Sequence, residues 1–258
     1  MATYLLKKSY QLKDLRETKF KDLWGDHGVF TTMWIFGKPS KILFFDSHIR
    51  NLIKSLKIYG IKKRSLKKDI LKLINKNLTK NKKYNHLLRI ALNKKIISIS
   101  LRKRIKPKLN FDLKLVNLKR EKPQYKNLKY KKILSYLSKM DNSRSDIGLV
   151  SNKKILETGT SNLLFVKDKK FFTPKKDYYQ GNTFKYFKSK IKRITKKDIF
   201  INELYHYDEI ILIGSGKGVA SVKTIKDINW RRKNLNKFNI LSKYYNSAIK
   251  NCNLYKFS

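Results

Sequence analysis

The sequence predicts a mixed α/β (α+β) protein of two domains. Strand patterns outnumber helix patterns in both halves of the chain, and the connections between them mix hairpins with crossovers. A charged segment around Pro107 separates the two halves. With 258 residues, 41% of them hydrophobic, the chain can bury the cores of two small domains. We expect the domains to cover 1–112 and 113–258, with a cleft between them as the functional site.

In the first half, residues 28–45 contain two β-rich runs joined by Gly37-Lys38-Pro39-Ser40, which predicts a hairpin. Over 47–59 the apolar residues recur at helical spacing, and we expect Ser47 to cap this helix. The other elements expected here are a helix over 66–77 and strands over 86–93 and 96–101.

In the second half, the pattern predicts three helices and a series of strands. The helices are expected over 128–140, 183–192 and 236–250. The strands are expected over 146–152 and 153–159, in a hairpin over 162–174, and over 208–214 and 219–225.

The charge of the chain is strongly positive, with 63 Lys and Arg against 18 Asp and Glu and a formal net charge of +45. Such an excess of positive charge is typical of proteins that bind nucleic acid or an anionic membrane. However, only 11 of the basic residues are Arg, and the lysines are spread over the whole chain together with abundant Asn, Ile, Tyr and Phe. An AT-rich coding sequence gives this composition whatever the function. We therefore keep a basic nucleic-acid-binding protein only as the non-enzyme alternative. A strongly basic cleft would also attract a small anionic substrate, which is the partner we expect.

The single cysteine, Cys252, excludes an internal disulfide and a multi-cysteine metal site, so we expect no metal and a reducing compartment. No apolar run approaches the roughly 18 to 20 residues of a spanning helix, and the N-terminal apolar run is too short for a signal peptide. We expect a cytoplasmic protein.

A glycine-rich loop follows a buried strand in the segment IILIGSGKGV, residues 210–219. A nucleotide P-loop would need a glycine where Ile211 stands and Ser or Thr where Gly218 stands. The dinucleotide pattern also fails, because a second strand follows instead of a helix. What remains is a strand, a glycine turn and a second strand, with Lys217 expected to point to solvent.

Several motifs occur together in one order, and that order carries more information than any one of them. They are the segments Gly25-Asp26-His27-Gly28-Val29-Phe30-Thr31-Thr32, His48-Ile49-Arg50-Asn51-Leu52, Tyr125-Lys126-Asn127-Leu128-Lys129-Tyr130, Glu157-Thr158-Gly159-Thr160-Ser161-Asn162, Gly181-Asn182-Thr183 and GSGKGVASV. Together they resemble the fold-type IV pyridoxal-phosphate enzymes, or class IV aminotransferases, over roughly residues 22 to 225. The resemblance implies a fold like that of D-amino acid aminotransferase, an active site in the interdomain cleft, pyridoxal 5'-phosphate as cofactor, and a homodimer.

The resemblance assigns the main catalytic residues. Lys126 matches the Schiff-base lysine, which also moves the Cα proton, and Tyr130 is a cofactor contact. Glu157 lies 31 residues after Lys126 and matches the acid at the pyridine nitrogen. The alternative for Glu157 is a salt bridge with a lysine at the end of a strand.

The cofactor phosphate is expected at the helix start after Gly181, on the backbone N–H groups around Asn182 and Thr183. The Thr183 hydroxyl and the loop residues Ser215 and Gly216 are further expected donors. The family's phosphate-binding arginine is replaced by Asn51, and Arg50 stands one residue earlier, rotated by about 100° around the helix. We expect either Arg50 or a lysine to supply the charge.

Two features favour one branch of the family. Thr31-Thr32 after Phe30 resembles the F-T-T of aminodeoxychorismate lyases, in which the second threonine protonates the departing pyruvate enol; this points to Thr32. Lys126 and Tyr130 are four residues apart, as in those lyases and in D-amino acid aminotransferases. We therefore expect 4-amino-4-deoxychorismate lyase, which releases pyruvate and 4-aminobenzoate for folate biosynthesis. The alternatives are a branched-chain or D-amino acid aminotransferase and, because Phe184 and Lys129 also depart from the family pattern, a degenerate, weakly active member.

Overall fold

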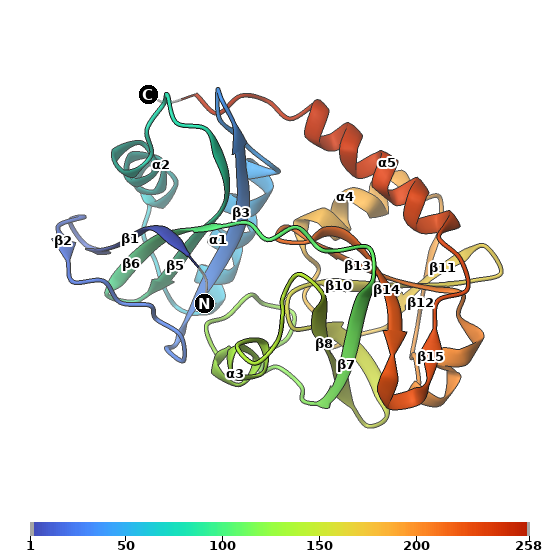
Figure 1. The fold of residues 1–258 in the computed structure, drawn as a ribbon. Helices are drawn as coiled ribbons and strands as arrows, with labels where there is room; N and C mark the ends of the chain where they lie inside the picture. The colour runs from blue at the N-terminus through green and yellow to red at the C-terminus, as the bar shows by residue number, and fades with distance from the viewer. Residues whose placement is uncertain (1–2, 257–258) are drawn as a thin grey trace. The chain divides into compact units, whose positions relative to one another are not determined.

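The computed structural model describes residues 3–256, which form two compact units (Figure 1). The first unit comprises the chain up to Arg104, Tyr125–Lys131 and the segment from Asn251 onward, and the second comprises Ile105–Gln124 and Lys132–Lys250. Each unit contains a sheet and helices, which confirms the predicted mixed α/β class. No helix of the described residues is both long and apolar enough to cross a membrane.

The first unit is built on a six-stranded sheet in which every neighbouring pair is antiparallel. Its strands are β1 (Tyr4–Gln11), β2 (Glu17–Thr18), β3 (Gly28–Gly37), β4 (Lys41–Ile42), β5 (Tyr84–Asn93) and β6 (Ile96–Lys103), in the order β2-β1-β6-β5-β3-β4. The predicted hairpin β3–β4 and the pair β5–β6 are confirmed. The sequence analysis missed β1, because its apolar pattern is broken by lysines and its pairing with β6 is what holds it extended.

Two helices cover one face of this sheet, α1 (Phe45–Ile58) and α2 (Leu66–Asn77). Their buried residues, such as Leu52 and Ile70, join Met33 and Ile35 of β3 in a single core. The prediction that Ser47 caps α1 was wrong. The helix begins earlier, with Phe44 at the N-cap in a left-handed conformation and no side-chain cap, so that Ser47 lies within the first turn.

The segment Tyr125–Lys131 belongs to the first unit, which differs from the expected boundary at 112 and from the placement of Lys126 in the C-terminal domain. It is bound through its backbone to the start of β3: the Phe30 N–H donates to the Lys126 carbonyl at 2.9 Å, and the Leu128 N–H donates to the Gly28 carbonyl at 3.0 Å. Because the backbone of these residues pairs with β3, the helix expected over 128–140 is limited to α3 (Lys131–Leu137).

The second unit contains a nine-stranded mixed sheet. Its strands are β7 (Phe111–Asn117), β8 (Ser145–Ser151), β9 (Lys154–Thr158), β10 (Asn162–Lys167), β11 (Lys170–Pro174), β12 (Ile194–Lys197), β13 (Glu209–Gly214), β14 (Gly218–Ile225) and β15 (Trp230–Arg231). The order is β12-β11-β10-β13-β14-β7-β8-β9, with β15 also on β14. The predicted strands are confirmed. The sequence analysis missed β7, which pairs in parallel with β8 and with β14, a strand distant in the sequence.

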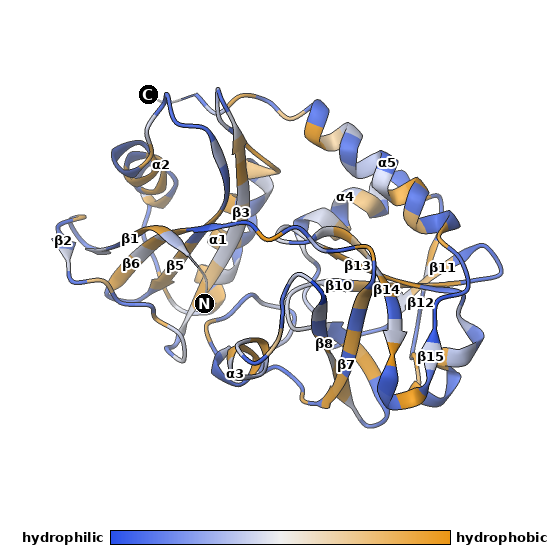
Figure 2. Cartoon of the chain, in the orientation of Figure 1, coloured by the Kyte–Doolittle hydropathy of each residue, from blue (hydrophilic) through white to orange (hydrophobic). Residues whose placement is uncertain are grey.

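Hydrophobic residues gather on the strands of each sheet, whereas the loops are mostly hydrophilic (Figure 2). The second unit contains α3 from Lys132 onward, α4 (Asn182–Lys190) and α5 (Asn236–Lys250), with short 3-10 turns η1 (Ile201–His206) and η2 (Lys226–Ile228). α5 packs against α4 and β14. Its first turn donates to the buried Glu209 of β13, from the Lys237 N–H at 2.7 Å and the Phe238 N–H at 2.9 Å.

We expect Glu209→Gln to lower the free energy of unfolding by about 1 kcal/mol, because one of the two N–H donors loses its acceptor. Burial raises the pKa of the Glu209 carboxyl above its ordinary value. A carboxyl with a raised folded-state pKa stabilises the fold below its unfolded pKa, and this contribution is lost as pH rises through the folded pKa. The difference in the free energy of unfolding between the wild type and the variant should therefore become smaller as pH rises. Urea unfolding between about pH 5 and pH 8 measures this difference and its pH dependence. A difference in the free energy of unfolding that grows with pH would contradict the prediction.

Candidate active site

Strand β3 presents the two threonines of the F-T-T segment to opposite faces of its sheet, because side chains alternate along a strand. Thr31 is buried on the helix-covered face, where its Oγ1 lies 2.7 Å from Nδ1 of His48 in α1. Thr32 is half-buried on the other face, which it shares with Phe30. The Lys126 Nζ lies 5.2 Å from the centre of the Phe30 ring. Thr32 and Lys126 are therefore on the same side of the first unit's sheet.

Aromatic rings line this side of the sheet around Lys126. Tyr130 stacks on Trp24 with ring centres 5.7 Å apart, and it meets Phe30 edge-on at 5.5 Å. The strand begins at Gly28, where a Cβ atom would lie 2.1 Å from the Leu92 carbonyl oxygen. The glycine of the GDHGVF segment is therefore required for the close approach of β3 to β5.

Arg89 of β5 is the cross-strand partner of Thr32 and is buried. It forms an ion pair with Asp22, and its guanidinium lies 4.3 Å from the centre of the Trp24 ring. The sequence analysis did not single out Arg89. The sequence feature that could have identified it is an arginine within the otherwise apolar pattern of a predicted strand.

Arg50 lies on the exposed side of α1, together with Lys54 and Lys57, whereas His48 and Leu52 are buried. Asn51, in the position of the family's arginine, is half-buried. The helix is continuous from Phe45 to Ile58, without the backbone shift that would bring Arg50 into the position of Asn51. The role of Arg50 at a phosphate stays a prediction.

In the second unit, Glu157 lies near the end of strand β9 as a buried carboxylate with a buried partner. Its Oε1 accepts from Nε of Arg120 at 2.7 Å, and its Oε2 accepts from the Tyr179 N–H at 3.3 Å. The Arg120 guanidinium also donates to the Pro123 carbonyl at 2.7 Å. The partner of Glu157 is thus an arginine, not the lysine considered from the sequence. Arg120 lies within residues 105–120, where the sequence predicts the boundary between the domains, so it was not considered as a partner for Glu157.

Helix α4 begins where the family motif predicts, and Asn162 fixes the chain before it. The Asn162 side chain accepts from the Gly181 N–H at 3.0 Å and donates to the Tyr179 carbonyl. The helix has no side-chain cap and no acid in its first turn. The Thr183 hydroxyl is fully buried and has no hydrogen-bond partner among the described residues. A buried hydroxyl without a partner costs free energy, which suggests that a ligand binds here.

The loop between β13 and β14 contains the predicted residues Ser215 and Gly216, both half-buried. The expectation that Lys217 points to solvent was wrong. Lys217 is 8% exposed, and its Nζ lies 3.7 Å from Oδ2 of the fully buried Asp146. A lysine between two glycines gives no signal of burial in the sequence, because its counter-charge lies far away in the chain.

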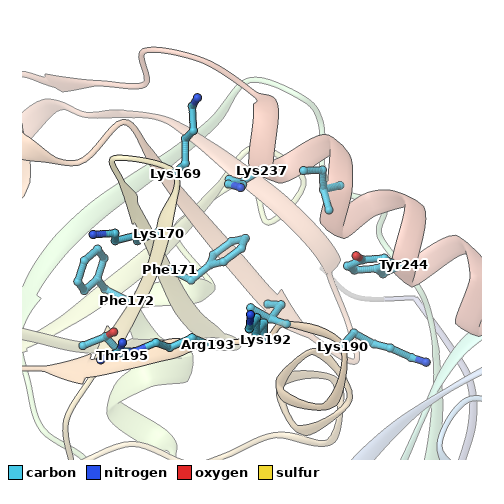
Figure 3. Close-up of a pocket in the computed structure, with 12 residues that line it drawn as sticks. Lys169, Lys170, Phe171, Phe172, Lys190, Lys192, Arg193, Thr195, Lys237 and Tyr244 are labelled. Atoms are coloured by element: carbon cyan, nitrogen blue, oxygen red, sulfur yellow. The ribbon is translucent and has the colours of Figure 1, made fainter.

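A groove in the second unit contains none of the predicted site residues (Figure 3). It has a volume of about 680 Å³ and lies between the β10–β11 hairpin, the end of α4, β12 and α5. Phe171 and Tyr244 contribute aromatic surface, and Lys170, Lys192 and Arg193 are among its basic residues. Its positive charge follows the lysine-rich composition of the whole chain.

The family of the chain follows from a comparison with family models. The model described as Amino-transferase class IV matches residues 28–225, and the chain therefore belongs to this family, whose enzymes use pyridoxal 5'-phosphate. It is a pyridoxal-phosphate-dependent enzyme of class IV. A search of curated proteins found no match.

Solved structures share the fold at low sequence identity. Branched-chain aminotransferase from Thermoproteus uzoniensis, crystallised with norvaline, has a TM-score of 0.73 at 17% identity over 94% of this chain and 93% of its own. The branched-chain amino acid aminotransferase from Thermobaculum terrenum, in its PLP form, has a TM-score of 0.73 at 13% identity over 94% of each chain. A hypothetical aminotransferase from Mycobacterium tuberculosis, in its PLP-bound form, has a TM-score of 0.68 at 14% identity over 95% of this chain and 99% of its own.

The residues present in this chain fit pyridoxal phosphate. The partnerless Thr183 hydroxyl, at a helix N-terminus without an acid, provides a donor where a phosphate would be favoured. The Glu157 carboxylate is held by Arg120 and by the Tyr179 N–H, and a carboxylate accepts hydrogen bonds from N–H donors, which is the chemistry that a protonated ring nitrogen requires.

Proposed function

We propose that this enzyme is a 4-amino-4-deoxychorismate lyase, which eliminates pyruvate from its substrate to give 4-aminobenzoate. The observation that carries the proposal is the position of Thr32 on the same sheet face as Lys126, while Thr31 is engaged by His48 on the opposite face. Only the second threonine of the F-T-T segment is therefore available on the side of the lysine. If β3 instead presented Thr31 on the side of Lys126, Thr31 would be the threonine available to donate the proton.

Each residue has one task in this proposal. Lys126 holds the cofactor covalently between turnovers, and its Nζ takes the proton from the substrate Cα. Glu157 keeps the ring nitrogen protonated, and Thr32 Oγ1 donates a proton to the departing enol of pyruvate. Tyr130, which packs against Phe30 as Lys126 does, contacts the cofactor. The first turn of α4, Thr183, Ser215 and Gly216 bind the phosphate. When bound, pyridoxal phosphate supplies an electron sink for the charge left at Cα.

The alternative is transamination, and the solved structures of branched-chain aminotransferases favour it as a second candidate. Product analysis separates the two functions. Pyruvate and 4-aminobenzoate formed from aminodeoxychorismate support the lyase. Glutamate formed from 2-oxoglutarate and an amino acid, without release of 4-aminobenzoate, would overturn it in favour of the aminotransferase.

A nucleic-acid-binding protein without enzymatic activity would behave differently in two measurements. Its affinity for an oligonucleotide would fall steeply with added salt, and it would take up no pyridoxal phosphate. A protein that acquires no visible absorbance in excess pyridoxal phosphate contradicts both enzymatic functions.

We expect Thr183→Val to have opposite effects on the protein with and without cofactor. Without cofactor, the isosteric change removes a buried hydroxyl that has no partner, so the free energy of unfolding should stay unchanged or rise by about 1 kcal/mol. With cofactor, the loss of a phosphate donor should weaken binding of pyridoxal phosphate about tenfold. Chemical denaturation and a spectroscopic titration measure the two effects.

Thr173→Val is the matched control, because the buried Thr173 hydroxyl already donates to the Leu163 carbonyl at 3.0 Å. This change should lower the stability by about 1 kcal/mol and leave the cofactor affinity unchanged. If Thr183→Val destabilises the cofactor-free protein as Thr173→Val does, the Thr183 hydroxyl has a structural partner and is not a phosphate donor.

A further inference from the structure

Lys217 is the buried exception in a chain rich in exposed lysines. It is the only lysine among the described residues that is buried, with 8% exposure, and the carboxylate beside it, Asp146, is fully buried. Burying an ammonium group costs several kcal/mol unless it is paired and hydrogen-bonded. A lysine in a surface turn could reach water easily, so its burial here indicates that the pair has a function in this loop.

Polar and aromatic neighbours hold the Lys217 side chain. Its Nζ lies 3.7 Å from Asp146 Oδ2, donates to the Asn142 carbonyl at 3.3 Å, and lies 4.6 Å from the centre of the Phe111 ring. The three contacts come from β7, from the start of β8 and from the segment before it. The lysine thus fastens the β13–β14 loop to a different part of the second unit.

The same loop is rich in glycine. Gly214 and Gly218 form its closing pair, and Gly218 has a positive φ of 73°. Gly216 has no side chain to pack, and Ser215 is half-buried. Since glycines allow many backbone conformations, the buried Lys217 side chain restricts the loop between these two glycines.

Asp146 connects this loop to the turn that follows Glu157. Asp146 Oδ2 accepts from the Thr158 hydroxyl at 3.0 Å and from the Thr160 hydroxyl at 2.6 Å, and the Thr158 hydroxyl in turn accepts from the Ser161 N–H at 2.8 Å. The loop and the turn also touch directly, because a Cβ atom at Gly214 would lie 2.8 Å from Ser161 Oγ. One carboxylate therefore organises the turn after the proposed ring-binding acid and neutralises the lysine of the proposed phosphate-binding loop.

From these contacts we infer that Lys217 is a positioning residue: through its ion pair with Asp146, it holds the backbone of Ser215 and Gly216 in the conformation that binds the cofactor phosphate. The inference rests on the proposed function for the role of Ser215 and Gly216, but the anchoring of the loop by Lys217 is independent of it. In this inference Lys217 itself does not bind the phosphate, because its ammonium group is paired with Asp146.

The test compares Lys217→Met with Lys223→Met, in which an exposed lysine of the neighbouring strand β14 is changed in the same way. In the full-length protein without cofactor, hydrogen exchange of the backbone amides of residues 215–218 and 158–161 should accelerate about tenfold in Lys217→Met and not in Lys223→Met. Exchange in β5 and β6 should not change in either variant. With cofactor, Lys217→Met should weaken binding of pyridoxal phosphate about tenfold and raise KM more than it lowers kcat.

Two further variants keep the inference testable if Lys217→Met does not fold. Lys217→Arg retains the charge and should retain most of the amide protection, and Asp146→Asn should loosen both segments, because it removes the counter-charge while keeping the side-chain shape. Unchanged exchange of residues 215–218 in Lys217→Met, or equal loss of protection in Lys217→Arg, overturns the inference. If the wild type binds no pyridoxal phosphate, the proposed function fails, while the exchange data still decide whether Lys217 anchors the loop.

Discussion

Lys126→Ala should abolish the covalent attachment of pyridoxal phosphate and lower kcat by at least about 10²- to 10⁴-fold, the usual contribution of a positioned acid–base group. The proposed phosphate and ring contacts of the second unit do not involve Lys126, so the cofactor should still bind without a covalent bond. After reduction with borohydride, the wild-type peptide that contains Lys126 should carry the mass of the reduced cofactor. The corresponding peptide of the variant should carry none.

Lys129→Ala is the control for this experiment, because Lys129 lies in the same short segment and its side chain is exposed. It should keep the covalent attachment and most of the activity. Attachment that persists in Lys126→Ala and disappears in another lysine variant would show that the resemblance assigned the wrong lysine.

Glu157→Ala should be the most destabilising of the single changes in the site. It leaves Arg120, whose side chain is only 3% exposed, without the carboxylate that lies 2.7 Å from its Nε. Removing one partner of a buried ion pair costs about 3–5 kcal/mol, because the other charge stays buried without compensation. Denaturant unfolding of the cofactor-free protein measures this loss.

The double variant Glu157→Gln, Arg120→Met separates the structural task of Glu157 from its catalytic task. With both charges removed, much of the stability should return, since a buried pair replaced by neutral groups is often tolerated. The activity should stay low, by about 10²- to 10³-fold, because no carboxylate remains to stabilise charge at the ring nitrogen. A double variant that regains both stability and activity would reduce Glu157 to a structural salt bridge.

The sequence alone predicted most of the helices and strands, and it identified the family. Helix α2 and helix α5 have the predicted bounds, because their apolar residues recur at a spacing that only a helix can bury on one face. The strands of the hairpins were predicted for the same local reason. The motif order sufficed to identify the family, because each motif is a short contiguous segment that requires no knowledge of contacts distant in sequence.

Only the tertiary structure decided which side chains meet. The burial of Lys217 depends on Asp146, and the partner of Glu157 is Arg120, 37 residues earlier in the chain. The segment Tyr125–Lys131 joins the first unit because its backbone pairs with β3, and no side-chain pattern records such a pairing. The periodicity of apolar residues indicates which face of a helix or strand is buried. An ion pair or a parallel strand pairing instead depends on where segments distant in the sequence pack. These interactions stabilise the fold only once those segments are in contact.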